Sequence, residues 1–283
     1  MAYLGIPQNT IAVLQKYHFN FQKKFGQNFL IDTTVLDRII SSAEITKEDC
    51  VLEIGPGIGT MTQYLAERAG SVVTVEIDKA LIPILEETLQ DYDNVTVIND
   101  DILKVDINRL VEEKNGGRPI KVVANLPYYI TTPIIMGLFE SRVPLKSITI
   151  MVQKEVAERL YAKPGTKDYG ALSVWIQSYV RVEWGFVVGP GAFNPPPKVD
   201  SAVVTFIPLP RERHPADPKA LSSILKLCFQ LRRKQLQSIL RRAGRDDTAA
   251  ALERLGIAPE ARPETLTPEQ FQQLAGIFGR SGC

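Results

Sequence analysis

The sequence has few of the residues that build disulfide frameworks, zinc sites and histidine-dependent active sites. Its 283 residues include only three cysteines, Cys50, Cys228 and Cys283, and no Cys-x-x-Cys pair. An odd, scattered set of cysteines predicts neither a disulfide scaffold nor a zinc site. The two histidines, His18 and His214, argue against a histidine metal cluster and histidine acid–base catalysis. We therefore expect no bound metal.

Long apolar runs are also absent. No stretch approaches the ~18 consecutive apolar residues of a membrane-spanning helix. The first 17 residues, MAYLGIPQNTIAVLQKY, lack the basic segment and long apolar segment of a secretory signal. The sequence thus predicts a cytoplasmic protein with no membrane partner. Its length leaves room for one large domain and one smaller one.

The sequence has almost no net charge, but positive charge is concentrated in one segment. The formal net charge is +1, yet residues 211–245 hold ten lysines and arginines against two acidic residues, so the rest of the chain carries −7. Such an asymmetry predicts an anionic partner that docks near this segment.

Short apolar, β-branched runs alternate with helical patterns through most of the chain. They cover residues 50–54, 71–77, 94–98, 120–126 and 147–152. This alternation predicts an α/β fold with a parallel sheet covered by helices on both faces. Two later runs, 180–188 and 201–209, predict an antiparallel pair that extends the sheet.

After a proline-rich, charged linker only helical patterns remain. Asp217 and Pro218 suit the N-cap and first turn of a helix, and a helical pattern then continues to Gly244. We expect a sheet domain over residues 1–209 and a smaller, all-helical domain over residues 210–283.

The loop after the first apolar run is rich in glycine, in the stretch LEIGPGIGTMT. Gly55, Gly57 and Gly59 lie between a strand and a helix, where glycine permits positive φ and close approach of a ligand. The next run ends at Glu76, where a carboxylate can accept hydrogen bonds from both ribose hydroxyls. The spacing is not the G-x-G-x-x-G of dinucleotide sites, and Glu53 is ill suited to a neighbouring pyrophosphate. A ribose-bearing cofactor without phosphate, such as S-adenosylmethionine, fits better than NAD; a plain tight turn is the alternative.

Two further acids follow the third run, in the stretch INDDIL. Asp100 or Asp101 can accept the exocyclic amine of the cofactor's adenine, with Ile102 against the ring. A solvated turn is the usual explanation of such a pair. These acids nevertheless fall at the carboxyl ends of consecutive strands, where open α/β sheets bind ligands.

The fourth run ends in NLPY. Asn125 offers a side-chain carbonyl, and the Leu126 carbonyl lies beside it because Pro127 has no competing amide hydrogen. Two such acceptors can hold the exocyclic amine of a base and aim its lone pair at a methyl donor, which needs no strong general base. Tyr128 offers a ring for stacking on a base that is unpaired or flipped out. A strand-end turn with buried tyrosines is the alternative.

Together these stretches resemble the KsgA-type small-subunit ribosomal RNA adenine dimethyltransferases. The matching motifs, in order, are KKFGQNFLID, LEIGPGIGTMT, VEID, NDDIL, ANLPYYITTPI, MVQKEVAERL and FNPPPKVDSAVV, and the likeness covers roughly residues 20–280. The resemblance implies a Rossmann-like S-adenosylmethionine-dependent methyltransferase sheet. It also implies dimethylation at N6 of two adjacent adenines in the 3′-terminal hairpin of small-subunit (16S) rRNA, within a precursor subunit and with a role in subunit biogenesis. We expect a monomer.

The resemblance also assigns residues. The implied contacts to S-adenosylmethionine are Asn28, Leu30, Gly55, Glu76, Asp101 and Asn125. It makes GQNFL a flap over the cofactor, with Gln27 as an additional contact. Phe193 is implied to sandwich the target adenine together with Tyr128, which adds both to the catalytic set of Asn125, Leu126 and Pro127.

The basic segment contains LRRKQLQSILRRAGR, which predicts a helix with an arginine-rich surface. We expect its four arginines, Arg232, Arg233, Arg241 and Arg242, to contact RNA phosphates. A solvated helix face is the alternative explanation of such charge.

Three other functions share parts of this pattern. A macrolide-resistance enzyme that methylates a large-subunit rRNA adenine has the same fold, but its family tends to have Ile where Leu126 stands. A non-catalytic RNA-binding assembly factor does not need the intact glycine loop, Glu76, Asp101 and NLPY. DNA adenine methylases more often carry D/N-P-P-Y/W at this position.

Overall fold

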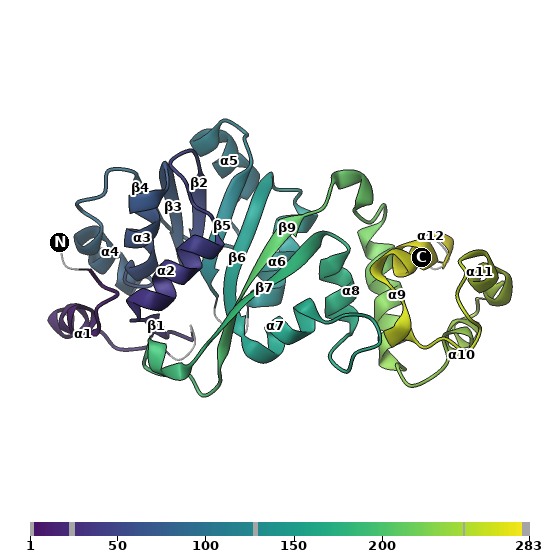
Figure 1. The fold of residues 1–283 in the computed structure, drawn as a ribbon. Helices are drawn as coiled ribbons and strands as arrows, with labels where there is room; N and C mark the ends of the chain where they lie inside the picture. The colour runs from purple at the N-terminus through teal and green to yellow at the C-terminus, as the bar shows by residue number, and fades with distance from the viewer. Residues whose placement is uncertain (1–2, 23–25, 127–129, 246, 279–283) are drawn as a thin grey trace. The chain divides into compact units, whose positions relative to one another are not determined.

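The computed structural model describes residues 3–22, 26–126, 130–245 and 247–278 (Figure 1). The chain divides into two compact units. The first comprises Met1–Ala157 and Glu183–Ile207, and the second comprises Glu158–Val182 and Pro208–Cys283. The start of the second unit's C-terminal part, at residue 208, falls near the boundary expected at residue 209. The segment 158–182, which we expected in the sheet domain, groups instead with the C-terminal helices.

A seven-stranded sheet forms the centre of the fold, in the order β4-β3-β2-β5-β6-β9-β7. Its strands are β2 (Cys50–Ile54), β3 (Ser71–Glu76), β4 (Val95–Asn99), β5 (Ile120–Asn125), β6 (Leu145–Gln153), β7 (Val180–Val188) and β9 (Ser201–Pro208). Strands β2 to β6 pair in parallel, and β9 pairs antiparallel to β6. The predicted Rossmann-like α/β fold and all seven predicted strands are confirmed.

Helices precede and connect the strands of the first unit. They are α1 (Pro7–Lys16), α2 (Thr33–Ser42), α3 (Thr60–Arg68), η2 (Lys79–Leu81), α4 (Ile82–Thr88), α5 (Ile107–Asn115), α6 (Thr131–Glu140), α7 (Lys154–Tyr161), which runs on into the second unit, and η3 (Pro190–Ala192). Aspartates at positions 32, 78 and 106 start helices by accepting hydrogen bonds from first-turn amides. β2 is buried along its whole length, as expected for a strand covered on both faces.

A second, two-stranded sheet joins distant parts of the first unit. β1 (Phe29–Leu30) pairs antiparallel with β8 (Phe193–Asn194), with Leu30 opposite Phe193. The Ile31 amide donates to the Ala192 carbonyl oxygen at 2.8 Å and continues the pairing. This pairing brings GQNFL and FNPPPKV together.

The second unit is helical after residue 208. It contains α8 (Ala171–Gln177), η4 (Arg211–Arg213), α9 (Pro218–Gln230), α10 (Leu236–Arg242), α11 (Thr248–Arg254), η5 (Pro263–Thr265) and α12 (Pro268–Phe278). Inside this unit Tyr169 meets the Phe229 ring edge-on and donates from its hydroxyl to the Leu266 carbonyl oxygen at 2.8 Å. These contacts explain why residues near 170 group with the C-terminal helices.

The prediction of one continuous helical pattern up to Gly244 is wrong at residues 231–235, which connect α9 to α10. Leu231, the first residue of the LRRKQLQSILRRAGR stretch, is 40% exposed. The break occurs because the Leu236 amide donates to the Ala261 carbonyl oxygen at 2.8 Å rather than back along the chain. Among the described residues, no helix is long and apolar enough to cross a membrane.

Candidate active site

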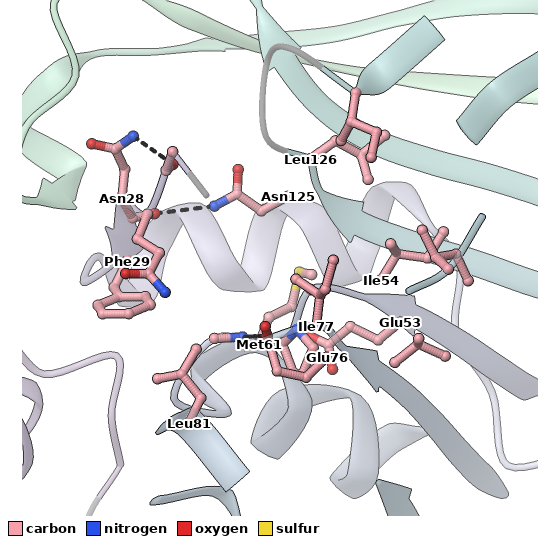
Figure 2. A pocket seen from close by; sticks show the side chains of 18 of the residues that line it. Asn28, Phe29, Glu53, Ile54, Met61, Glu76, Ile77, Leu81, Asn125 and Leu126 are labelled. Carbon is pink, nitrogen blue, oxygen red and sulfur yellow. Dashed lines mark hydrogen bonds between the residues drawn. The ribbon is translucent and has the colours of Figure 1, made fainter. Parts of the chain in front are cut away.

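A pocket lies at the carboxyl ends of β2, β3 and β5, the edge where open α/β sheets bind ligands (Figure 2). Its lining includes all six residues proposed to contact the cofactor: Asn28, Leu30, Gly55, Glu76, Asp101 and Asn125. Leu126 and Phe193 line it as well. Pro127 and Tyr128, the other two residues of the predicted catalytic set, lie outside the described residues.

The glycine loop leaves space in this pocket. Gly55 and Gly57 have φ of +70° and +62°, a conformation that other residues rarely adopt. A Cβ at Gly57 would come within 2.8 Å of the Phe29 ring, whereas one at Gly55 would meet no atom of the described residues within 4 Å apart from its chain neighbours. A side chain at Gly55 would therefore project into open space beside the pocket, where a ligand can approach the backbone.

Glu76 ends β3 with a buried, fixed carboxylate. One oxygen accepts from the Gly57 amide at 3.2 Å and the other from the Asp78 amide at 2.8 Å. Burial raises the pKa of Glu76 to about 7, although these amides favour its charged form. Each oxygen keeps a lone pair that can accept a hydrogen bond from a hydroxyl group of a ligand.

Glu53 contributes a second buried carboxyl to the same pocket. Its side chain is 0% exposed, and Thr62 Oγ1 donates to Oε2 at 2.6 Å. Among the described residues, Oε1 has no hydrogen-bond partner. Burial raises the pKa of Glu53 to about 8, and the nearby Glu76 raises it further. The described lining residues include acids but no lysine or arginine, a composition that suits a cationic ligand better than a phosphate.

Residues Gly26–Ile31, which we call the strap, close one side of the pocket. The Asn28 carbonyl oxygen accepts from Asn125 Nδ2 at 3.4 Å (Figure 2). Gln27 Nε2 donates to Asp78 Oδ2 at 2.7 Å. The strap therefore contacts the ends of two strands, β5 and β3.

Two of the predicted base-holding residues, Asn125 and Phe193, differ in surroundings. Asn125 is half-buried at the end of β5, and its bond to Asn28 uses the amide nitrogen and leaves Oδ1 as an acceptor. Phe193 is 3% exposed and belongs to the hydrophobic core, where it packs with residues such as Leu30. Phe193 thus has a packing role in addition to any contact with a ligand.

The acids after β4 form a turn that also faces the pocket. Asp101 Oδ1 accepts from the Leu103 amide at 3.0 Å, and Asp100 Oδ1 accepts from the Asp101 amide at 2.7 Å. Both line the pocket together with Ile102. Both interpretations of the sequence, a turn and a ligand contact, are thus compatible with this geometry.

Sequence reasoning missed several lining residues. Met61 belongs to the start of α3, and Ile77, which is 44% exposed, directly follows β3. An exposed isoleucine directly after the acid of VEID is a signal that was available. Phe29 lies within GQNFL, the flap that the resemblance implied, but its place over the glycine loop was not predicted, because it depends on the pairing of β1 with β8.

The four predicted RNA-binding arginines are not equivalent. Arg233, Arg241 and Arg242 are exposed. Arg232 is half-buried, with Nε 3.4 Å from Glu264 Oε2 and Nη2 donating to the Lys167 carbonyl oxygen at 3.2 Å. Arg232 therefore has a structural task inside the second unit.

The chain matches a known protein family over most of its length. Residues 18–279 match the family model described as "Ribosomal RNA adenine dimethylase". The chain is 58% identical to the ribosomal RNA small subunit methyltransferase A of Lachnoclostridium phytofermentans, over 98% of both chains. It is 46% identical to the protein of the same name from Streptococcus pneumoniae, over 96% of this chain and 97% of that one.

Two solved structures are similar to most of the chain. A dimethyladenosine transferase from Plasmodium falciparum has a TM-score of 0.77 and 29% identity, covering 89% of this chain and 98% of that one. The 23S rRNA methyltransferase ErmE has a TM-score of 0.67 and 31% identity, covering 88% of this chain and 98% of that one.

Proposed function

The chain belongs to the ribosomal RNA adenine dimethylase family, and from that premise we propose that it methylates small-subunit (16S) rRNA. The reaction transfers methyl groups from S-adenosylmethionine to N6 of two adjacent adenines in the 3′-terminal hairpin, giving N6,N6-dimethyladenines. One observation carries the choice of subunit: near-full-length relatives 58% and 46% identical to this chain are named for the small subunit. The large-subunit enzyme ErmE is only 31% identical.

S-adenosylmethionine suits the pocket. The described lining holds acidic residues and no lysine or arginine, which suits a cationic ligand better than a phosphate, and the open space at Gly55 gives a ligand access to the backbone. Bound S-adenosylmethionine supplies an electrophilic methyl group on a sulfonium. In this proposal Glu76 accepts from the ribose hydroxyls and Asp101 from the adenine amine, and the remaining contacts come from Asn28, Leu30, Gly55 and Asn125.

The target amine is held by two acceptors. Asn125 Oδ1 and the Leu126 carbonyl oxygen each accept one N–H of the adenine amine, which turns the nitrogen lone pair out of conjugation with the ring. Asn125 is suited to this task because its Nδ2 is bound to the Asn28 carbonyl oxygen. No strong base is needed, since the nitrogen loses its proton only after methylation has made it cationic.

The target base must leave its stack to reach these acceptors. In the proposal Tyr128 and Phe193 sandwich the flipped adenine, and Pro127 keeps a competing amide hydrogen away from the Leu126 carbonyl. Support for Phe193 comes from its place in the pocket lining opposite Leu30 of β1.

The partner in this proposal is a precursor small subunit, bound by a monomer, and this role links methylation to subunit biogenesis. The exposed Arg233, Arg241 and Arg242 give the second unit a basic surface for rRNA phosphates.

The decisive experiment offers labelled S-adenosylmethionine and four substrates: undermethylated small subunits, large subunits, naked rRNA and DNA. We expect label on small subunits only, recovered as N6,N6-dimethyladenine. Label on large-subunit RNA alone would favour the macrolide-resistance type of enzyme. Binding to small subunits without any label would favour a non-catalytic assembly factor.

A further inference from the structure

Gln27 lies at the pocket but directs its side-chain amide to other parts of the protein. Its Nε2 donates to Asp78 Oδ2 at 2.7 Å, and its Oε1 accepts from the Gln22 backbone amide at 2.7 Å. Both ends of the amide are therefore engaged. This arrangement differs from the direct cofactor contact that the family resemblance implied.

Asp78 links this amide to Glu76. Asp78 is 5% exposed, and its Oδ1 accepts from the Ala80 amide at 3.1 Å at the start of η2. Its own backbone amide donates to Glu76 Oε1 at 2.8 Å. The hydrogen bonds thus run without a gap from the strap through Gln27 and Asp78 to the carboxylate proposed to hold the ribose.

The strap is paired with β8 on one side, but among the described residues its other links to the ends of β2, β3 and β5 are weaker than the Gln27 bridge. The bond from Asn125 to the Asn28 carbonyl oxygen is long, at 3.4 Å, and Phe29 contributes apolar contact over Gly57. A 2.7 Å hydrogen bond to a carboxylate is the stronger kind, because charge assistance roughly doubles the strength of a neutral bond.

From these contacts we propose that Gln27 is a positioning residue for the cofactor. Its bridge to Asp78 holds the strap against the end of β3, so that Asn28 and Leu30 meet the cofactor while Glu76 keeps its orientation. The inference rests on the proposed use of S-adenosylmethionine, and it assigns to Gln27 an effect on cofactor affinity without direct contact.

Exchanging the two partners of the bridge provides the test. Gln27→Glu sets two carboxylates against each other, and Asp78→Asn sets two amide nitrogens against each other. In the double variant the new amide at position 78 donates and the new carboxylate at position 27 accepts. That carboxylate still offers an oxygen to the Gln22 amide, and the new amide at position 78 still offers its oxygen to the Ala80 amide. The double variant therefore restores the bridge with its polarity reversed.

The readout is the Kd for S-adenosylmethionine, measured by calorimetric titration of the full chain without RNA. We expect each single variant to raise the Kd about tenfold or more, in line with the energy of a hydrogen bond to a charged group. The double variant should return within about threefold of the original value. With small subunits as substrate, the single variants should raise the KM for S-adenosylmethionine much more than they lower kcat.

Controls separate this role from general stability. Gln22→Ala is matched, because only the backbone amide of Gln22 takes part in the bridge, and it should leave the Kd unchanged. Gln27→Ala removes the bridge without adding charge and should raise the Kd in the same direction, with an unchanged melting temperature.

A Gln27→Glu Kd within threefold of the original would overturn the proposal, as would a double variant no better than its parents. Binding of S-adenosylmethionine without methylation of small subunits would instead refute the proposed substrate and leave the role of Gln27 measurable. An unaltered chain that does not bind S-adenosylmethionine would refute both.

Discussion

The side-chain amide of Asn125 donates from Nδ2 to the backbone carbonyl oxygen of Asn28 at 3.4 Å. The bond joins the end of β5 to the strap, two segments that are far apart in the sequence (Figure 2). Because the nitrogen is used in this way, the oxygen of the same amide is the end left for an incoming donor. The strap thus orients the residue proposed to hold the target amine.

Replacement of Asn125 tests that role. Asn125→Ala removes one of two acceptors for the target amine, and we expect methyl transfer to fall about 100-fold or more, as when one preorganised hydrogen bond is removed elsewhere. Single-turnover transfer of label to undermethylated small subunits measures the effect. The melting temperature should stay constant, since the Asn125 side chain is only half-buried. Full activity in this variant would refute the proposed mechanism.

Phe193 needs a substitution that keeps the core filled. Because Phe193 is 3% exposed, Phe193→Ala should cost about 3–5 kcal/mol of unfolding free energy and would obscure any effect on stacking. Phe193→Leu keeps most of the apolar volume and should cost less than about 1.5 kcal/mol. We expect this variant to lose about tenfold in kcat/KM for small subunits, because the ring is gone, with little change in the Kd for S-adenosylmethionine. A variant that loses unfolding free energy but keeps its kcat/KM for small subunits would show that Phe193 has a packing role alone.

Much of this site was predictable because residues at the carboxyl ends of parallel strands meet at one edge. Gly55, Glu76, Asp101 and Asn125 each follow an apolar run that is visible in the sequence, and all four line the pocket. The positions of the strands could also be predicted, since each run is rich in apolar, β-branched residues.

The pairing of β1 with β8 was not predictable from local pattern. Each strand has two residues, and more than 160 positions separate them, so only tertiary contacts determine that Leu30 faces Phe193. The break at residues 231–235 has a similar cause: the bond from Leu236 to Ala261 overrides a helical pattern that continues through the segment. Local propensity is a weak guide wherever such contacts decide.

The buried Glu53 predicts an unusual dependence of stability on pH. Its pKa is raised from 4.5 to about 8, so the folded chain keeps this proton over a range in which the unfolded chain has released it. The contribution of Glu53 to stability is therefore fully present below pH 4.5 and is lost as pH rises through about 8. The slope for one such group is at most about 1.4 kcal/mol per pH unit.

Comparison with Glu53→Gln isolates this contribution. We expect the unfolding free energy of the unaltered chain to fall relative to the variant between about pH 5 and pH 8, in denaturant titrations without S-adenosylmethionine. Thr62→Val removes the hydroxyl that donates to Glu53 and favours its charged form, and it should extend the fall to higher pH without changing its slope. Parallel curves for the unaltered chain and Glu53→Gln would show that Glu53 is ionised in the folded state.

Asp49, which directly precedes β2, predicts a dependence of stability on pH opposite in sign to that of Glu53. Burial alone would raise its pKa, but hydrogen bonds from Lys146, Thr46 and Lys121 lower the pKa to about 2. The stability that Asp49 contributes is thus present above pH 3.8 and is lost as pH falls through about 2. Asp49→Asn leaves the buried Lys121 without its carboxylate, and we expect a cost of about 3–5 kcal/mol at pH 7. Lys146→Ala, at a side chain 55% exposed, should cost about 1 kcal/mol or less.

The basic surface of the second unit predicts salt-dependent binding of subunits. We expect the triple replacement of Arg233, Arg241 and Arg242 by alanine to weaken binding to small subunits. The slope of log K against log salt should fall by about 0.7 for each phosphate that the variant no longer neutralises. Arg232 is left in place, because its bonds to Glu264 and Lys167 serve the fold of this unit.

A matched control removes the same charge from the first unit. Arg68, Arg109 and Lys114 are exposed, and their replacement by alanine should leave the salt slope unchanged if binding depends on local contacts rather than net charge. The Kd for S-adenosylmethionine should be the same in both triple variants. An equal loss of subunit binding in both would mean that the three arginines attract RNA only through overall charge, and a parallel loss of cofactor affinity would indicate misfolding.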